Sequence, residues 1–176
     1  ELKPNYAEAY GNLGNTLYKN RKLQEAETNY KKAIELKPNH YKVHNNFGNI
    51  QFEFGKFEEA KTSYKKAIEL KPDYAEAHNN FGNIQFEFGK IEEAKTSYKK
   101  AIELKPDFAE AHNNLGNILK DLGDPNESLK SYRKAIEINP TLAEAHNNFG
   151  DALDKLGKIE EAEVSYKKAI ELKPNY

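Results

Sequence analysis

The chain has 176 residues, and its 27 Lys and Arg residues nearly balance its 28 Asp and Glu residues. This balance excludes an overall attraction to nucleic acid or to an anionic membrane, so neither is expected as a partner. The absence of cysteine excludes disulfides and thiolate metal sites; it fits a reducing cytoplasm, the expected location, although a secreted domain stays open. The apolar runs are too short for a membrane span or a signal peptide.

An internal repeat of 34 residues organises the chain. The phrase KKAIELKP, or RKAIEINP in one case, recurs at this period and closes each repeat with proline: Pro38, Pro72, Pro106, Pro140 and Pro174. Residues 1–6 are interpreted as the tail of a preceding, truncated repeat. Five repeats follow as one continuous array, at 7–40, 41–74, 75–108, 109–142 and 143–176.

Each repeat is predicted to form an antiparallel helix hairpin, because its apolar residues follow helical spacing at positions 1–14 and again at 18–31. In repeat 1 the turn between the helices contains Asn20 and Arg21. The later repeats have glycine there, which ends a helix in the left-handed conformation: Gly55, Gly89, Gly123 and Gly157. In repeat 4, Asp124 and Pro125 predict a well-capped second helix and replace an apolar residue, so this repeat is expected to pack slightly differently.

The motif residues of the repeat resemble those of the tetratricopeptide repeat family over the whole chain. In repeat 3 these residues are His78, Phe81, Gly82, Ala94, Tyr98, Ala101 and Pro106, and the other repeats agree closely except that Ser128 replaces one alanine. The resemblance implies an all-α fold, a right-handed superhelical solenoid of antiparallel helix hairpins. It also implies a concave groove lined by the first helix of every repeat.

Asparagine recurs along one polar stripe of the first helices, at positions 6 and 9 of the repeats. Position 6 holds Asn12, Asn46, Asn80, Asn114 and Asn148. Position 9 holds Asn15, Asn49, Asn83, Asn117 and Asp151. Each amide offers a donor and an acceptor, so such a row can pair with the backbone of an extended peptide. The row resembles the asparagine ladder of O-GlcNAc transferase repeat domains, which implies peptide binding. The alternative is that these residues are merely solvated or bond across the hairpin.

Charged and aromatic residues refine this groove. Positions 2, 9 and 13 hold eight acidic residues against Lys19, Lys42 and Lys155, so a neutral or basic extended partner is expected. Tyr18, Phe52 and Phe86 at position 12 are candidate anchors for a partner. They could instead pack on neighbouring helices, with Gln51 and Gln85 beside them bonded across the hairpin.

No residue pattern predicts catalysis, a cofactor or a metal site. His44, His78, His112 and His146 recur once per repeat and are too widely spaced to share a metal, while His40 belongs to a turn. The serines of the second helices have no activating histidine nearby.

The sequence therefore predicts a non-catalytic scaffold that binds a protein or peptide. Two alternatives are self-assembly through end-to-end stacking of uncapped repeats and a role as the substrate-recognition arm of a larger enzyme, such as a glycosyltransferase.

Overall fold

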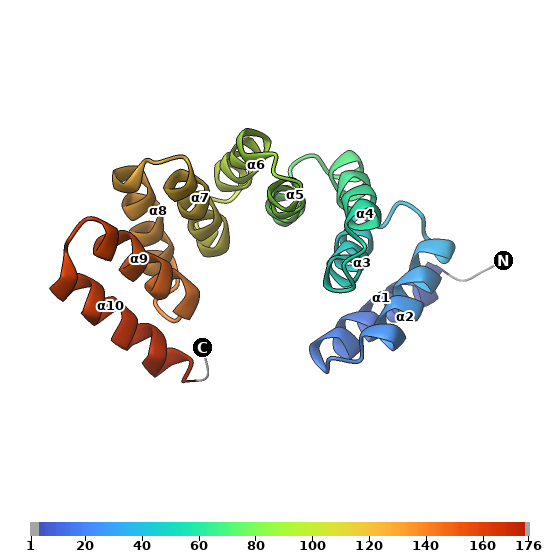
Figure 1. Ribbon diagram of the computed structural model, residues 1–176. Helices are drawn as coiled ribbons and strands as arrows, with labels where there is room; N and C mark the ends of the chain where they lie inside the picture. The colour runs from blue at the N-terminus through green and yellow to red at the C-terminus, as the bar shows by residue number, and fades with distance from the viewer. Residues whose placement is uncertain (1–3, 175–176) are drawn as a thin grey trace. The chain divides into compact units, whose positions relative to one another are not determined.

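The computed structural model describes residues 4–174, and all regular structure in this range is α-helical. One compact unit, Glu1–Phe88, contains α1 (Pro4–Lys19), α2 (Leu23–Leu36), α3 (Tyr41–Glu53), α4 (Phe57–Leu70) and α5 (Ala75–Glu87). The other, Gly89–Tyr176, contains α6 (Ile91–Leu104), α7 (Ala109–Asp121), α8 (Pro125–Ile138), α9 (Ala143–Lys155) and α10 (Ile159–Leu172) (Figure 1). The predicted all-α fold built from helix hairpins is confirmed.

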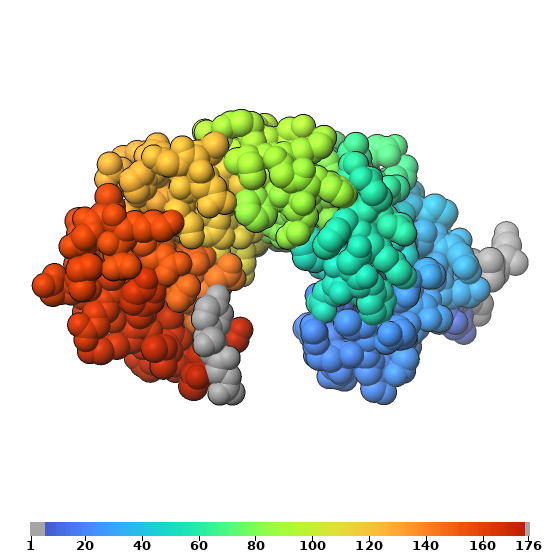
Figure 2. All heavy atoms as spheres, in the orientation of Figure 1, coloured from blue at the N-terminus to red at the C-terminus, as the bar shows by residue number. Residues whose placement is uncertain are grey.

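Within each unit, consecutive helices pack as antiparallel hairpins, and each hairpin packs on its neighbour. The pairs α1 with α2 and α3 with α4 form the hairpins of the first unit, and α5 packs on α4 and α3. In the second unit α7 pairs with α8 and α9 with α10, while α6 packs on α7. Figure 2 shows atoms of neighbouring hairpins in direct contact, blue against teal in the first unit and orange against red in the second.

A glycine facing a tyrosine ring sets the close approach of the two helices in a hairpin. A Cβ added to Gly48 would lie 2.6 Å from Cε1 of Tyr64, and one added to Gly116 would lie 2.5 Å from Cε1 of Tyr132. Both rings are almost completely buried. Because no side chain larger than hydrogen fits, the glycine and the tyrosine together fix the spacing of the helices.

The turns inside the hairpins use left-handed backbone, as the glycines predicted. Gly55, Gly89, Gly123 and Gly157 have φ angles of 69°, 69°, 79° and 74°. In the first hairpin Arg21 takes the same role with a φ of 59°, which costs a residue with a Cβ more than it costs glycine.

The start of α8 differs from the starts of its counterparts, as predicted. The Asp124 carboxylate accepts a hydrogen bond from the Glu127 backbone N–H at 3.2 Å, and Pro125 begins the helix. No other second helix has a side-chain cap. Leu129 is buried in a cluster with Tyr132 and Leu153, which offsets the apolar residue lost at Pro125.

The first helix begins at Pro4, inside the segment that the sequence assigned to a preceding repeat. Proline is favoured in the first turn because its missing N–H would have no helical partner there. Residues 1–3 of that segment and residues 175–176 lie outside the described range.

Candidate functional site

The side-chain oxygen at position 9 holds the hydroxyl of a tyrosine fifteen residues later in the same hairpin. The hydroxyls of Tyr30, Tyr64, Tyr132 and Tyr166 donate to Asn15, Asn49, Asn117 and Asp151 at 2.7, 2.9, 2.7 and 2.9 Å. Because the Asp151 carboxylate can only accept, the tyrosine must be the donor in repeat 5, and the same direction fits the asparagines. The reading that these residues bond across the hairpin therefore holds for their oxygen atoms.

The amide at position 6 connects each repeat to the preceding one. In the first unit, Asn46 Nδ2 donates to Asn15 Oδ1 at 2.7 Å, and Asn80 Nδ2 donates to Asn49 Oδ1 at 3.0 Å. In the second unit, Asn148 Nδ2 donates at 3.0 Å to the oxygen of Asn113, which stands at position 5. We use the term asparagine ladder for the residues at positions 6 and 9. In the first unit, hydrogen bonds join position 6 of one repeat to position 9 of the preceding repeat.

At Asn15 and Asn49 the network leaves amide donors, rather than acceptors, for a partner. Asn15 Oδ1 and Asn49 Oδ1 each accept two hydrogen bonds, from a tyrosine hydroxyl and from the asparagine of the next repeat. Rotating either amide by half a turn would place its NH₂ group against these two donors. The Nδ2 atoms of Asn15 and Asn49 are therefore directed away from the network, whereas the sequence alone predicted both donors and acceptors.

The surface beside the ladder is hollowed in the first unit. One cavity of about 340 Å³ is lined by Asn12, Asn15 and Asn46, with Glu8, Lys42 and Tyr41 among its other walls. A second cavity of about 280 Å³ is lined by Asn15, Asn46 and Asn49 together with Tyr18, Lys19 and Tyr30. The two cavities share Asn15 and Asn46, so the ladder lines the hollow along α1 and α3.

A turn residue lowers the negative charge expected along α1 and α3. The Arg21 guanidinium contacts Glu53 Oε2 at 2.9 Å, and the Tyr18 hydroxyl donates to Glu53 Oε1 at 2.6 Å. Burial, and then the hydrogen bond to Glu53, raises the pKa of Tyr18 to about 12. Arg21, which lies outside positions 2, 9 and 13, therefore offsets the negative charge of Glu53.

The three candidate anchors have different surroundings. Phe52 packs with Tyr64 and Ile84, and its ring lies edge-on to that of Phe57 at 5.3 Å. Tyr18 packs partly against the core of the first hairpins, whereas Phe86 is 38% exposed.

The neighbouring glutamine is bonded across the hairpin. Gln51 Oε1 is buried and accepts a hydrogen bond from the Ser63 hydroxyl at 2.6 Å. The alternative in which the glutamine bonds across the hairpin therefore holds for Gln51. Phe52, which that alternative placed inward, is partly buried and packs against the core, while Gln51 itself is buried.

The histidines at position 4 serve the turns between repeats. Nε2 of His44, His78, His112 and His146 lies 2.7 to 3.0 Å from the carbonyl oxygen of the proline six residues earlier. Among the described residues, no group of three or more histidine and acidic side chains is arranged to hold a metal ion. The described helices also include none with the length and apolarity needed to cross a membrane.

The remaining ladder residues lie on the first helices as predicted by position. Asn12 is exposed on α1, while Asn83 and Asn114 are half-buried on α5 and α7 and make polar contacts. Sequence reasoning missed the tyrosines that hold the ladder. The constant spacing of fifteen residues between them and position 9 was the available signal.

Hairpins closed by glycine–tyrosine packing, with a polar stripe on their first helices, define a helical repeat protein. Models of the tetratricopeptide repeat match residues 7–40, 109–142 and 143–176, and 29–62, and a TPR repeat model matches 48–89 and 82–123. The chain belongs to the tetratricopeptide repeat family. No protein with a curated description matches its sequence.

Solved structures of other repeat proteins are similar to this chain. MamA has 27% sequence identity and a TM-score of 0.72, over 92% of this chain and 94% of its own. YrrB, described as a TPR protein with an unusual peptide-binding site, has 25% identity and a TM-score of 0.66, over 95% and 86%. Cut9 in complex with Hcn1 has 18% identity and a TM-score of 0.92, over 98% and 35%, and shows a shared fold.

Proposed function

We propose that this protein is a non-catalytic scaffold that holds an extended segment of a partner protein or peptide along its asparagine ladder. The observation that carries the proposal is the direction of the Asn15 and Asn49 amides. Their oxygens are held by Tyr30 and Tyr64 and by the asparagine of the next repeat, so their N–H groups are directed toward a ligand. Such donors match the carbonyl groups of an extended chain, whatever its side chains.

The side chains of the site are already ordered in the folded protein, before a partner binds. Asn15 and Asn49 are half-buried and each is held by two hydrogen bonds, so few side-chain rotamers are lost on binding. The cavities of about 340 and 280 Å³ beside them offer room for side chains of the partner. The peptide-binding site named for YrrB supports the same class of partner for this chain. The surplus of acidic residues on the stripe favours a neutral or basic segment.

Replacing Asn15 and Asn49 by aspartate tests the direction of the amides. Aspartate keeps an acceptor for Tyr30 and Tyr64, as Asp151 does for Tyr166, but it removes the N–H donors. Wild type and Asn15→Asp/Asn49→Asp would be titrated with neutral extended peptides selected on the wild type from an immobilised library. We expect the variant to lose at least about tenfold in affinity.

A control with the same added charge separates the loss of donors from electrostatics. Thr28 and Thr62 are exposed on α2 and α4, so Thr28→Asp/Thr62→Asp adds two charges away from the ladder. This control should bind like wild type. Equal losses in both variants, or a library that yields no peptide for the wild type, would refute the proposal.

A second candidate function is assembly of copies through α10. Ile159, Val164 and Ile170 are 54%, 68% and 60% exposed on this helix, whereas Ile34 and Ile136, the counterparts of Ile170, are half-buried. Sedimentation velocity at increasing concentration tests this candidate. A mass that grows with concentration in the wild type but stays constant in Ile170→Glu would support assembly, and a constant wild-type mass would refute it.

A further inference from the structure

A cavity of about 300 Å³ between α6, α7 and α8 lies apart from the asparagine ladder. Three exposed lysines, Lys99, Lys130 and Lys134, contribute to its wall, and the more buried Ile102 and Leu115 contribute its apolar part. On α7, Leu115 falls on a different face from Asn114 and Asn117 because successive helical residues turn by about 100°.

The other repeats show what normally occupies the position of Leu115. Phenylalanine stands there in repeats 2, 3 and 5, with a cation from the preceding repeat over its ring. Lys31 lies 6.0 Å from the centroid of Phe47, Lys65 5.8 Å from that of Phe81, and the Arg133 guanidinium 5.8 Å from that of Phe149. The corresponding cation in repeat 3, Lys99, faces the smaller and non-aromatic Leu115 instead.

Repeat 4 has two further substitutions, one in the wall of this cavity and one on α7 nearby. Lys130 stands where repeats 1 to 3 have threonine, and it adds a cation that those repeats lack. Leu119 stands where repeat 2 has Gln51, so the bond that holds Ser63 in repeat 2 has no counterpart, and Ser131 lines the cavity. The cavity thus lies where the other repeats have a cation–aromatic contact. Leu115 replaces the aromatic ring, and Lys130 adds a positive charge.

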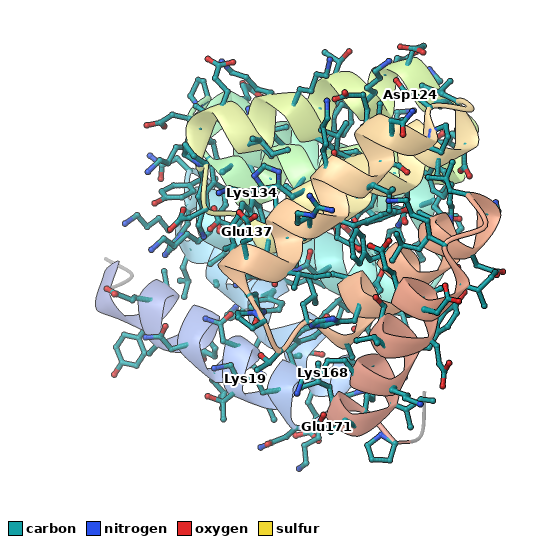
Figure 3. The ribbon with its side chains drawn as sticks, turned by 90° about the vertical axis from the view of Figure 1, so that its left-hand side faces the viewer. Lys19, Asp124, Lys134, Glu137, Lys168 and Glu171 are labelled. Atoms are coloured by element: carbon teal, nitrogen blue, oxygen red, sulfur yellow. The ribbon has the colours of Figure 1, made fainter. Side chains whose placement is uncertain are left out.

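The positive charges around the cavity are available to a partner. In the described part of the chain, Lys99 pairs with no carboxylate. Lys134 Nζ lies 3.1 Å from Glu137 and Lys130 pairs with Glu127, but these pairs are exposed and weak enough for a partner carboxylate to compete. Figure 3 shows Lys134 and Glu137 together on α8.

We propose that this cavity binds a partner segment that inserts an aromatic side chain flanked by carboxylates. The inserted ring would contact Ile102 and Leu115 below the Lys99 ammonium, as Phe47, Phe81 and Phe149 lie below their cations. The flanking carboxylates would pair with Lys130 and Lys134. This site does not depend on the proposed role of the ladder, which favours neutral or basic segments.

The test uses the peptide acetyl-Asp-Asp-Phe-Asp-Asp-amide as the probe, with its Phe-to-Ala analogue as the reference. Binding to the whole chain would be followed by NMR chemical shifts at low and high salt. We expect shifts on α6, α7 and α8, at least about tenfold weaker binding of the alanine analogue, and weaker binding at high salt.

Leu115→Phe is the decisive variant because three other repeats accept phenylalanine at this position. It should fill the cavity and weaken probe binding at least about tenfold without loss of the fold. Lys130→Thr restores the residue of repeats 1 to 3 and should weaken binding several-fold, while Leu13→Phe, the same change in repeat 1, should have no effect. Unchanged binding by Leu115→Phe, equal binding of the alanine analogue, or shifts confined to the ladder would each overturn the proposal.

Discussion

Repeats 2 and 4 share one internal frame but differ at the surfaces that they offer to partners. In both, a glycine faces the ring of a buried tyrosine whose hydroxyl donates to a position 9 asparagine. Outside this frame, repeat 2 has a Gln51–Ser63 bond and the ring of Phe47, whereas repeat 4 has leucines at both places and a capped second helix. The comparison shows that the shared frame fixes the hairpin, while the remaining positions are open to change.

The largest effect is expected from breaking the shared frame itself. Gly48→Ala and Gly116→Ala place a Cβ within 2.6 Å of a buried tyrosine ring. Each should lower the free energy of unfolding by about 1–3 kcal/mol, even though alanine favours helix by about 1 kcal/mol over glycine. Urea unfolding would measure the loss, with Thr62→Ala and Lys130→Ala as controls at exposed positions. Tolerance of alanine in either repeat would show that the frame is not shared.

The side-chain cap of α8 can be removed from repeat 4 and introduced into repeat 2. Asp124→Lys should lower the stability of α8 by about 1 kcal/mol because its side-chain cap is lost. Lys56→Asp, at the equivalent position of repeat 2, should stabilise α4 by less than this amount because Lys56 also lies 5.1 Å from the Phe54 ring centroid. Hydrogen exchange of the first turns of α4 and α8 would report both changes. Equal protection of α8 in Asp124→Lys and wild type would argue against the cap.

The hydrogen bonds from Tyr64 and Tyr132 should contribute equally to the free energy of unfolding. Tyr64→Phe and Tyr132→Phe each remove one hydrogen bond to asparagine, worth about 1 kcal/mol near neutral pH.

Alkaline pH gives the same bonds a second signature. Burial raises the pKa of Tyr64 and Tyr132 well above the ordinary value near 10, so the unfolded chain loses these protons first. The associated stability is present below about pH 10 and falls as pH rises further. Unfolding midpoints measured from pH 7 to 11 should therefore decline less steeply in the phenylalanine variants. Parallel declines in variants and wild type would contradict this assignment.

The smallest effect concerns the turn of repeat 1, where Arg21 stands in place of the glycine found in repeats 2 and 4. Arg21→Gly relieves a φ of 59° but removes the contact with Glu53. Since the relief and the exposed ion pair are each worth about 1 kcal/mol or less, we expect a net stabilisation of about 0.5 kcal/mol. Thermal unfolding would detect it, and a clear destabilisation would mean that the Arg21–Glu53 pair outweighs the strain.

Local signals in the sequence predicted the hairpins well. Apolar spacing placed two helices in each repeat, Gly55 and its equivalents marked the turns, and Asp124 marked the capped start of α8. These features depend on residues a few positions apart, so they can be recognised without tertiary contacts. The role of the ladder residues in binding a peptide stays a prediction.

The amide directions could not be predicted, because they depend on partners fifteen to thirty-five residues away. Asn15 alone can donate or accept, and only Tyr30 and Asn46 together decide which atom is left for a ligand. The choice between Gln51 and Phe52 was open for the same reason, since Ser63 on the facing helix decides it.

By itself, the sequence determined the repeat, the helix hairpins and the family, because the same apolar spacing and turn residues recur every 34 residues. Only the tertiary structure decided which polar atoms are held internally, and it alone revealed the cavity beside Leu115. The physical reason is that hydrogen-bond direction and cavity volume depend on the packing of neighbouring hairpins.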